Sequence, residues 1–130
     1  MATVTFTATD ECGLQITTQA TFHIVDSTPP NIVTTASDLT MECSDPATNQ
    51  MALQDWLDSN GGAVANDICH NFTWSSDFTG LTGICDQTAF VTFTALDECG
   101  NSASTSATIS IVDTDAPDLT IPNDIPRLLQ

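Results

Sequence analysis

The sequence contains no lysine and a single arginine, Arg127, against seventeen aspartate and glutamate residues. With a formal net charge of −16, the chain repels nucleic acid and anionic membrane surfaces. The acidic residues stand singly among apolar and threonine-rich sequence, which is typical of an acidic folded surface rather than of a disordered tail. Cations are therefore the expected partners, and nucleic acid is not.

Long apolar runs are also missing. No stretch approaches the roughly 18 consecutive apolar residues of a membrane-spanning helix, so we expect no membrane insertion. Met1 is followed directly by strand-like sequence instead of a charged and then apolar leader. Any export signal is therefore expected outside these residues.

The sequence has no CxxC pair, although it contains five cysteines: Cys12, Cys43, Cys69, Cys85 and Cys99. Thiolate metal sites usually contain such pairs, so disulfide bonds are the favoured interpretation. Disulfides persist in oxidising compartments, which predicts an extracellular or periplasmic setting. The lack of lysine and the many threonine, serine, aspartate and asparagine residues favour a surface protein, so we expect an extracellular, cell-surface location. Four cysteines allow three pairings, and the sequence alone does not select one.

The most informative feature present is an internal repeat. The segment VTFTATDECG at residues 4–13 returns as VTFTALDECG at residues 91–100. Between residues 4–26 and 91–113, 15 of 23 positions are identical, at a constant offset of 87 residues. This period suits one small β-sandwich of roughly 100 residues. The chain therefore holds about one and a half repeat units.

Apolar and polar residues alternate along the repeated segments, which indicates strands with one buried face. We predict a first hairpin, with Val4, Phe6 and Ala8 inward on one strand and Ala20, Phe22 and Ile24 inward on the next. A second hairpin is predicted over residues 90–96 and 103–112. The fold class is all-β, a β-sandwich repeat with one short helix per repeat.

Between the hairpins, residues 31–43 are predicted to form one strand with Leu39 and Met41 inward. Leu53, Trp56 and Leu57 fall at helical spacing after Asn49, the expected N-cap, so a short helix is predicted to seal one end of the sandwich. Two more strands are predicted over residues 63–68 and 72–76, with Trp74 as the buried indole.

Proline-containing linkers divide the chain into three parts. Residues 1–28 are predicted to be the C-terminal hairpin of a preceding repeat, 29–117 a complete domain, and 118–130 the first strand of a following repeat. A lone hairpin is marginal in water. Two arrangements stay open: neighbouring repeats of one long chain, or copies joined head to tail by their hairpins.

A family resemblance rests on a hairpin and on several residues outside it. The hairpin residues are Thr94, Ala95, Asp97, Cys99, Gly100 and Asn101, followed by IVD and a proline-containing linker. This pattern resembles the hyalin-repeat (HYR-like), immunoglobulin-type domains. Leu14 and Gln15 depart from it in the first hairpin, where the second has Asn101 and Ser102, which puts the first turn in question.

Further features are similar to a version found in tandem in very large secreted surface proteins of Bacteroidetes-type bacteria: Glu42 with Cys43, the segment ALQDWLDSNGGA, Asp67 with Cys69, and Trp74. Many of those proteins are exported by the type IX pathway and act as adhesins or gliding-associated filaments. The resemblance implies immunoglobulin-like β-sandwich repeats that serve mostly as spacers.

In the immunoglobulin-like strand order that this resemblance implies, Cys43 and Cys85 lie at the far pole beside the helix. Cys69 and Cys99 lie at the near pole, where the first linker enters. Bridges between Cys43 and Cys85 and between Cys69 and Cys99 are then predicted, and Cys12 is left unpaired.

The same strand order brings four acidic residues to the near pole: Asp26, Asp67, Asp97 and Glu98. Several oxygen ligands at a domain junction suit calcium, which is the candidate cofactor. The competing interpretation is that these acids cap turns, since aspartate bonds its own backbone there. No EF-hand motif supports calcium.

No pattern of residues predicts catalysis. Neither His23 nor His70 is expected near a nucleophile, and no zinc site, phosphate loop or catalytic elbow is recognisable. We expect a structural repeat that acts as a disulfide-stabilised spacer in a filament or adhesin, and not an enzyme. The alternative is a module that binds glycan or another surface through its near-pole loops, which would require an exposed aromatic platform.

Overall fold

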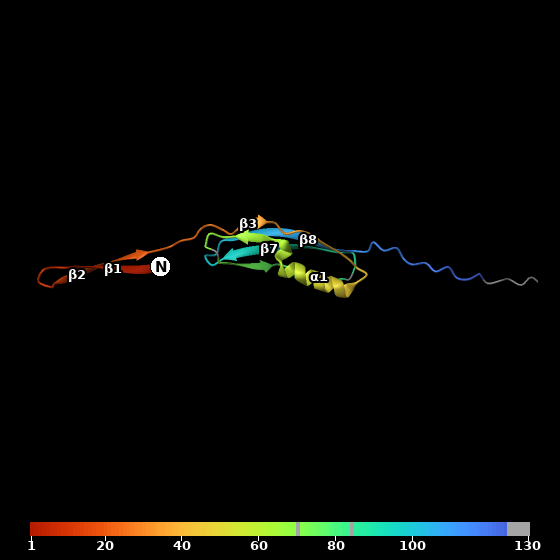
Figure 1. The fold of residues 1–130 in the computed structure, drawn as a ribbon, viewed down its shortest axis with the longest axis horizontal. Coiled ribbons are helices and arrows are strands. Elements are labelled where there is room, and N and C mark those ends of the chain that lie inside the picture. Colours follow the sequence, from red (N-terminus) through yellow and green to blue (C-terminus); the bar gives the residue numbers. More distant parts are fainter. Residues whose placement is uncertain (70, 84, 125–130) are drawn as a thin grey trace, which may run out of the picture.

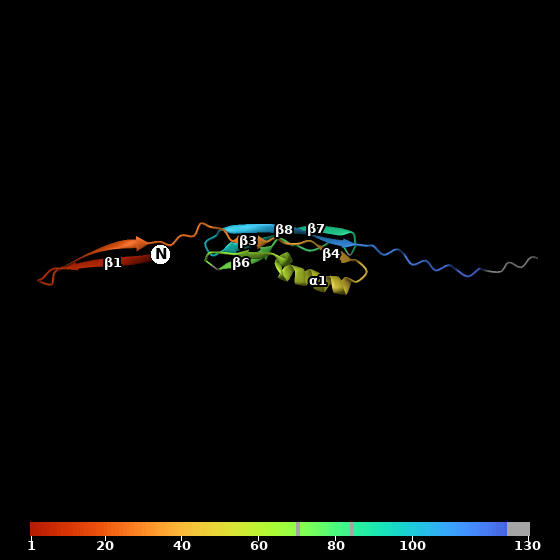
Figure 2. The ribbon, with the colours of Figure 1, turned by 45° about the horizontal axis from the view of Figure 1, so that its top comes forward.

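The computed structural model describes residues 1–69, 71–83 and 85–124 of the chain. The described part is mostly β-structure with one α-helix (Figure 1), which agrees with the coarse form of the prediction. An N-terminal hairpin stands at one end, a body spanning residues 31–112 lies in the middle, and an extended segment leaves the body at the other end (Figures 1 and 2).

The N-terminal hairpin pairs β1 (Ala2–Thr9) with β2 (Gln15–Phe22) in antiparallel register, from Ala2 opposite Phe22 to Thr9 opposite Gln15. Every residue of both strands is exposed, including Val4, Phe6 and Phe22. The predicted hairpin is therefore present, but the face predicted to point inward is not covered by any of the described residues.

The body is built on a four-stranded sheet in the order β4–β8–β7–β6. Its two long strands, β7 (Gln87–Asp97) and β8 (Ser102–Val112), form the second hairpin. On one side β6 (Phe72–Ser76) pairs antiparallel with β7, and on the other β4 (Leu39–Glu42) pairs parallel with β8. A separate two-stranded sheet joins β3 (Asn31–Thr34) to β5 (Val64–Asn66).

Strict alternation along β7 and β8 forms the core, as expected for strands with one buried face. Val91, Phe93 and Ala95 of β7 and Ile109 of β8 are 0% exposed. Met41, Trp56, Ala107 and Ile111 complete the buried cluster. The inward placement of Met41 is thereby confirmed, and Leu39 packs against the same cluster.

The helix α1 (Pro46–Asp58) lies along this apolar face and covers it, with a 3₁₀ turn η1 (Asn60–Gly62) at its end (Figure 2). The prediction that the helix seals an end of the sandwich was therefore wrong. Trp56 meets Phe93 edge-on with ring centroids 5.1 Å apart, and its indole N–H donates to the Ser37 carbonyl at 2.8 Å. The buried indole is Trp56 rather than Trp74, which is half-buried.

The helix begins four residues earlier than predicted, because Asp45 and not Asn49 is the N-cap. The Asp45 side chain accepts from the Thr48 N–H at 3.1 Å, and Pro46 occupies the first turn, where its missing N–H is harmless. Asn49 instead donates its side-chain amide to the Glu42 carbonyl.

The strand predicted over residues 31–43 is broken into β3 and β4. Between them the chain crosses from β5 to β8, and local contacts hold the crossing: the Ala36 N–H donates to Thr105 Oγ1 at 3.0 Å, and Asp38 Oδ1 accepts from the Thr108 N–H at 2.7 Å. Alternation does not encode this change of partner strand, so the break could not be predicted from the sequence.

Candidate functional site

The candidate site lies where the first linker, residues 23–30, meets the body. Asp26 comes from this linker, and Asp67 and Cys69 follow β5. One ligand atom from each of these three residues lies within 4.8 Å of the other two. We call this group the junction cluster. It contains two of the four predicted calcium ligands, Asp26 and Asp67.

The other two predicted ligands lie in the β7–β8 turn and do not join the junction cluster. Asp97 Oδ1 accepts from the backbone N–H groups of Cys99 and Asn101, at 2.9 and 2.8 Å, and its Oδ2 accepts from the Asn101 side chain at 2.8 Å. Glu98 is exposed in the same turn. For Asp97 the turn-capping interpretation was therefore right, because hydrogen-bond donors occupy both of its oxygens.

The environment of Asp97 favours its charged form. Its side chain is only 6% exposed, and burial alone would raise its pKa. Hydrogen bonds from the Asn101 side chain and from the backbone of Asn101, Cys99 and Gly100 outweigh burial, and the pKa lies below the ordinary value of 3.8. Such multiply bonded carboxylates stay ionised to low pH.

Asp10 forms the same turn in the first hairpin, despite Leu14 and Gln15. Its Oδ1 accepts from the N–H groups of Cys12 and Leu14, both at 2.9 Å. Gly13 and Gly100 both adopt a positive φ, 86° and 93°, which glycine tolerates best. The departure from the pattern therefore leaves the turn type unchanged.

Asn101 is a site residue that the sequence interpretation missed. Its side-chain amide donates to Asp97 and also to the Asp26 carbonyl, the latter at 3.2 Å, and so ties the linker to the body. The repeat offered a sequence signal for this role, because the equivalent residue of the first hairpin, Leu14, has no side-chain amide.

Asp26 and Asp67 each bind one backbone N–H and leave one oxygen without a partner. Asp26 Oδ1 accepts from the Thr28 N–H at 2.9 Å, and Asp67 Oδ2 accepts from the Cys69 N–H at 3.0 Å. Asp26 Oδ2 and Asp67 Oδ1 are buried and have no hydrogen-bond partner. Asp67 as a whole is 9% exposed. Buried polar atoms are normally satisfied, so these two oxygens require an explanation.

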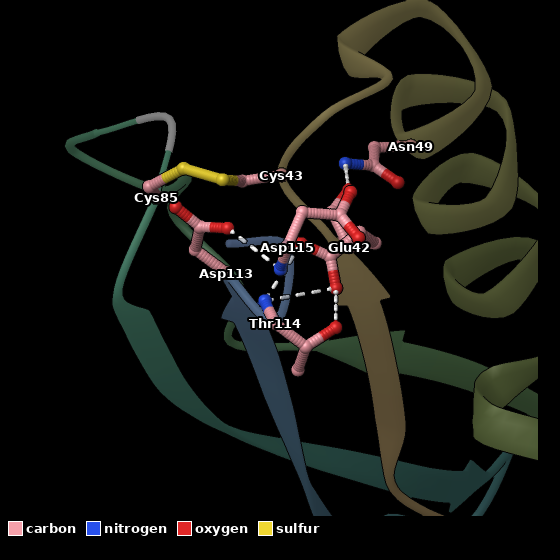
Figure 3. The surroundings of a disulfide bond; sticks show 7 residues. All are labelled: Glu42, Cys43, Asn49, Cys85, Asp113, Thr114 and Asp115. Atoms are coloured by element: carbon pink, nitrogen blue, oxygen red, sulfur yellow. Dashed lines mark hydrogen bonds between the residues drawn. A yellow bond between two sulfur atoms is a disulfide. The ribbon is translucent and has the colours of Figure 1, made fainter. Parts of the chain in front are cut away.

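A disulfide joins Cys43, just after β4, to Cys85 in the loop before β7, with 5.2 Å between Cα atoms. This is the first of the two predicted pairs, and it lies beside the start of α1 (Figure 3). Closing a loop of this length stabilises the fold by about 4 kcal/mol in the chain-entropy model.

The other predicted pair, Cys69 with Cys99, is not bonded in the structure. Both thiols are free and exposed, as is that of Cys12. A short-range interaction with the Asp26 carboxylate is the largest cause that raises the pKa of the Cys69 thiol to about 11, and burial and the charges of Asp26, Asp67 and Cys99 add to it.

The second linker is held differently at the opposite end of the body. The backbone N–H and hydroxyl of Thr114 donate to the Glu42 carboxylate, which caps the end of β4 (Figure 3). The hydrogen bond from the Thr114 hydroxyl is the largest cause that holds the pKa of Glu42 below its ordinary value, and the bond from the Thr114 backbone N–H is the second. Asp113, the repeat equivalent of Asp26, accepts from the Asp115 N–H at 3.1 Å. Its turn matches that of Asp26 with Thr28.

His23 is exposed in the first linker, whereas His70 and residues 125–130, with Arg127, lie outside the described residues. Residues 113–124 are extended and form no strand, and Leu119 and Ile121 in this segment are each 85% exposed. Within the described part of the chain, no helix is long and apolar enough to span a membrane.

Comparison with known proteins adds no assignment. The chain matches no protein-family model, and a search of curated proteins finds no match.

Proposed function

We propose that this chain is a structural repeat of an extracellular filament or cell-surface adhesin, in which disulfide-stabilised domains act as a spacer. One observation carries the proposal: the same apolar face is buried in the β7–β8 hairpin and exposed in the β1–β2 hairpin. Phe93 and its repeat equivalent Phe6 are 0% and 56% exposed. A face of this kind is expected to have a covering partner.

The best candidate for that partner is the remainder of a preceding repeat. In the body, β4 and β6 pair with the two edges of the β7–β8 hairpin, and α1 packs on its apolar face. Because the two hairpins share the inward residues Val, Phe and Ala at equivalent positions, equivalent elements would fit β1–β2. We therefore retain the division into residues 1–28, 29–117 and 118–130 as part of the proposal.

We further infer that a complete repeat is an immunoglobulin-like sandwich. Two features support this finer fold: the first part of the unit is divided between two sheets, β3 with β5 and β4 with β8, and the hairpin β7–β8 forms the middle of the larger sheet. Both suit a two-sheet sandwich with crossing connections. The HYR-like resemblance points to the same class.

The Cys43–Cys85 bridge and the lysine-free acidic composition support an oxidising, extracellular setting. That setting is where the secreted surface proteins suggested by the resemblance operate. The absence of enzymatic activity stays a prediction.

An extended protein tests the proposal directly. If a second copy of residues 29–87 precedes residue 1, the period of 87 residues is unbroken, because residue 1 is equivalent to residue 88. We expect the backbone amides of β1 and β2 to become protected from hydrogen exchange. Their protection factors should come within about tenfold of those of β7 and β8, because each hairpin would then belong to a cooperative folded unit.

The matched control carries Trp56→Ser in the added copy only, which removes the side chain that would cover Phe6. Protection of β1 and β2 should then fall while that of β7 and β8 is kept. If the β1–β2 amides exchange as fast in the extended protein as in the present chain, the repeat does not complete this hairpin and the spacer proposal fails.

The alternative, a glycan- or surface-binding module, lacks a supporting observation. Such a module needs exposed aromatic side chains grouped in a platform. Among the described residues, the strongly exposed rings are Phe6, Phe22 and Phe90, and the first two belong to the face already attributed to a core. Phe90 alone is no platform.

A further inference from the structure

We propose that Asp26 and Asp67 form a binding site for a divalent cation, Ca²⁺, which clamps the first linker to the body. The site itself stands on the geometry of the junction cluster. Its consequence for an array of domains rests on the proposed function.

Position is the first argument. Asp26 belongs to the linker and Asp67 to the end of β5, yet their carboxylates offer ligand atoms within 4.8 Å of each other. A second contact keeps the linker at this place, since Asn101 donates to the Asp26 carbonyl. The two acids therefore stay close even though they repel each other.

The unpartnered oxygens are the second argument, independent of the clustering. Asp67 is nine-tenths buried, and its Oδ1 has no hydrogen-bond partner. Asp26 is half-buried, and its Oδ2 atom is buried and also has no partner. In both residues the opposite oxygen is held by a backbone N–H, so the carboxylates are fixed in orientation. Fixed, buried and unpartnered carboxylate oxygens are what a metal ligand looks like before the metal is bound.

Charge balance is the third argument. The chain has no lysine and one arginine, and the described residues contain neither. The described part therefore has no lysine or arginine to neutralise the two carboxylates, and its one histidine, His23, is exposed in the linker. A bound cation supplies the missing positive charge.

The choice of Ca²⁺ follows from the donor atoms. Both unpartnered atoms are carboxylate oxygens, which hard cations prefer, and Ca²⁺ accepts water and backbone carbonyls for its remaining ligands. With only two carboxylates we expect a Kd of about 0.1–1 mM, the range of extracellular modules. The Cys69 sulfur beside them makes Zn²⁺ the competitor to exclude.

The repeat extends the inference to later junctions. Asp113 stands 87 residues after Asp26 and makes the same turn in the second linker. In an array, Asp113 would meet the equivalent of Asp67 in the following unit. One cation would then brace each junction.

The test is calorimetric titration of the full chain, with its Cys43–Cys85 bridge intact, with CaCl₂ after chelation. We expect one Ca²⁺ per chain. Asp67→Asn and Asp26→Asn should each weaken binding at least about tenfold, because each removes a charged ligand. Asp118→Asn removes the same charge from an exposed position in the extended segment after the body and should change the Kd less than about twofold.

A folding readout keeps the variants interpretable. In chelator, Asp67→Asn should melt at the same temperature as the unchanged chain or higher, since it removes a buried unpaired charge and its amide oxygen can still accept from Cys69. On addition of Ca²⁺, the melting temperature of the unchanged chain and of Asp118→Asn should rise, whereas that of Asp67→Asn and Asp26→Asn should rise less.

The proposal would be overturned by the absence of saturable Ca²⁺ binding up to about 10 mM, or by Ca²⁺ binding that Asp67→Asn leaves intact. Tight Zn²⁺ binding lost in Cys69→Ser, without Ca²⁺ binding, would also reject a hard-cation site. Each of these results leaves the spacer proposal standing, because that is decided by the exchange protection of β1 and β2.

Discussion

The hairpins β1–β2 and β7–β8 share most of their sequence and an identical turn, yet their surroundings differ completely. Val91 and Phe93 are 0% exposed, whereas Val4 and Phe6 at the equivalent positions are 45% and 56% exposed. Pairing and turn are local and form in both. Burial requires α1, β4 and β6, which only the second hairpin has. The comparison separates what a hairpin sequence specifies from what a core supplies.

The largest expected effect is a direct test of this comparison. Phe93→Ala should lower the free energy of unfolding of the body by about 3–5 kcal/mol, because it empties a fully buried site under Trp56. Phe6→Ala should change it by less than about 0.5 kcal/mol. Urea unfolding followed by tryptophan fluorescence measures both. Equal effects would mean that the two hairpins share one cooperative core.

The disulfide should matter to the body and not to the first hairpin. Replacing both Cys43 and Cys85 with alanine removes a covalent link across a sequence separation of 42 residues and should cost about 3–4 kcal/mol. Cys12→Ala is the control, with a change within about 0.5 kcal/mol, because that thiol is free and exposed. Thermal unfolding compares the variants; a loss below about 1 kcal/mol in the double variant would contradict the chain-entropy estimate.

The contact between the helix end and the second hairpin gives the next effect. Gly61 has φ +66°, and a Cβ there would lie 3.0 Å from both Phe93 Cε2 and the Ala36 Cβ. Gly61→Ala should therefore cost about 2–3 kcal/mol from backbone strain and overpacking. Gly62→Ala, with φ +78° and nothing within 4 Å, should show the backbone strain alone, about 1 kcal/mol. Equal losses in urea unfolding would show that the close approach to Phe93 is not limiting.

The smallest effect is a pH dependence from the second turn. Because the pKa of Asp97 in the folded state lies below 3.8, its ionised form stabilises the body above that pH, and this contribution is lost as the pH falls through the folded pKa. The stability difference between the unchanged chain and Asp97→Asn should shrink from pH 7 to pH 3. Asp10→Asn is the matched control and should affect body stability less at either pH. A difference that grows on acidification would reverse the assignment.

Local features of this chain were readable from the sequence. The alternation in the repeat predicted both hairpins, but its inward face is buried only in the second, since Val4, Phe6 and Ile24 are exposed. The spacing of Leu53, Trp56 and Leu57 predicted a helix in the right region. The turn at Asp97 and Gly100 was also predictable, since both residues act through neighbouring backbone groups. These features depend on contacts within a few residues.

Three outcomes depended on contacts that the sequence does not encode locally. The break between β3 and β4 follows from a change of partner strand, the position of α1 follows from where the apolar face of β7 and β8 lies, and the junction cluster follows from the path of the linker. Asp26 and Asp67 are separated by forty residues of chain, so only the folded body brings them together. Asp97 is also a carboxylate, but hydrogen bonds within its own turn occupy both of its oxygens. The sequence by itself determined the repeat, the strands and the charge; the tertiary structure decided which apolar face is covered and which carboxylates are left without partners, because covering and neutralising both require groups brought from distant parts of the chain.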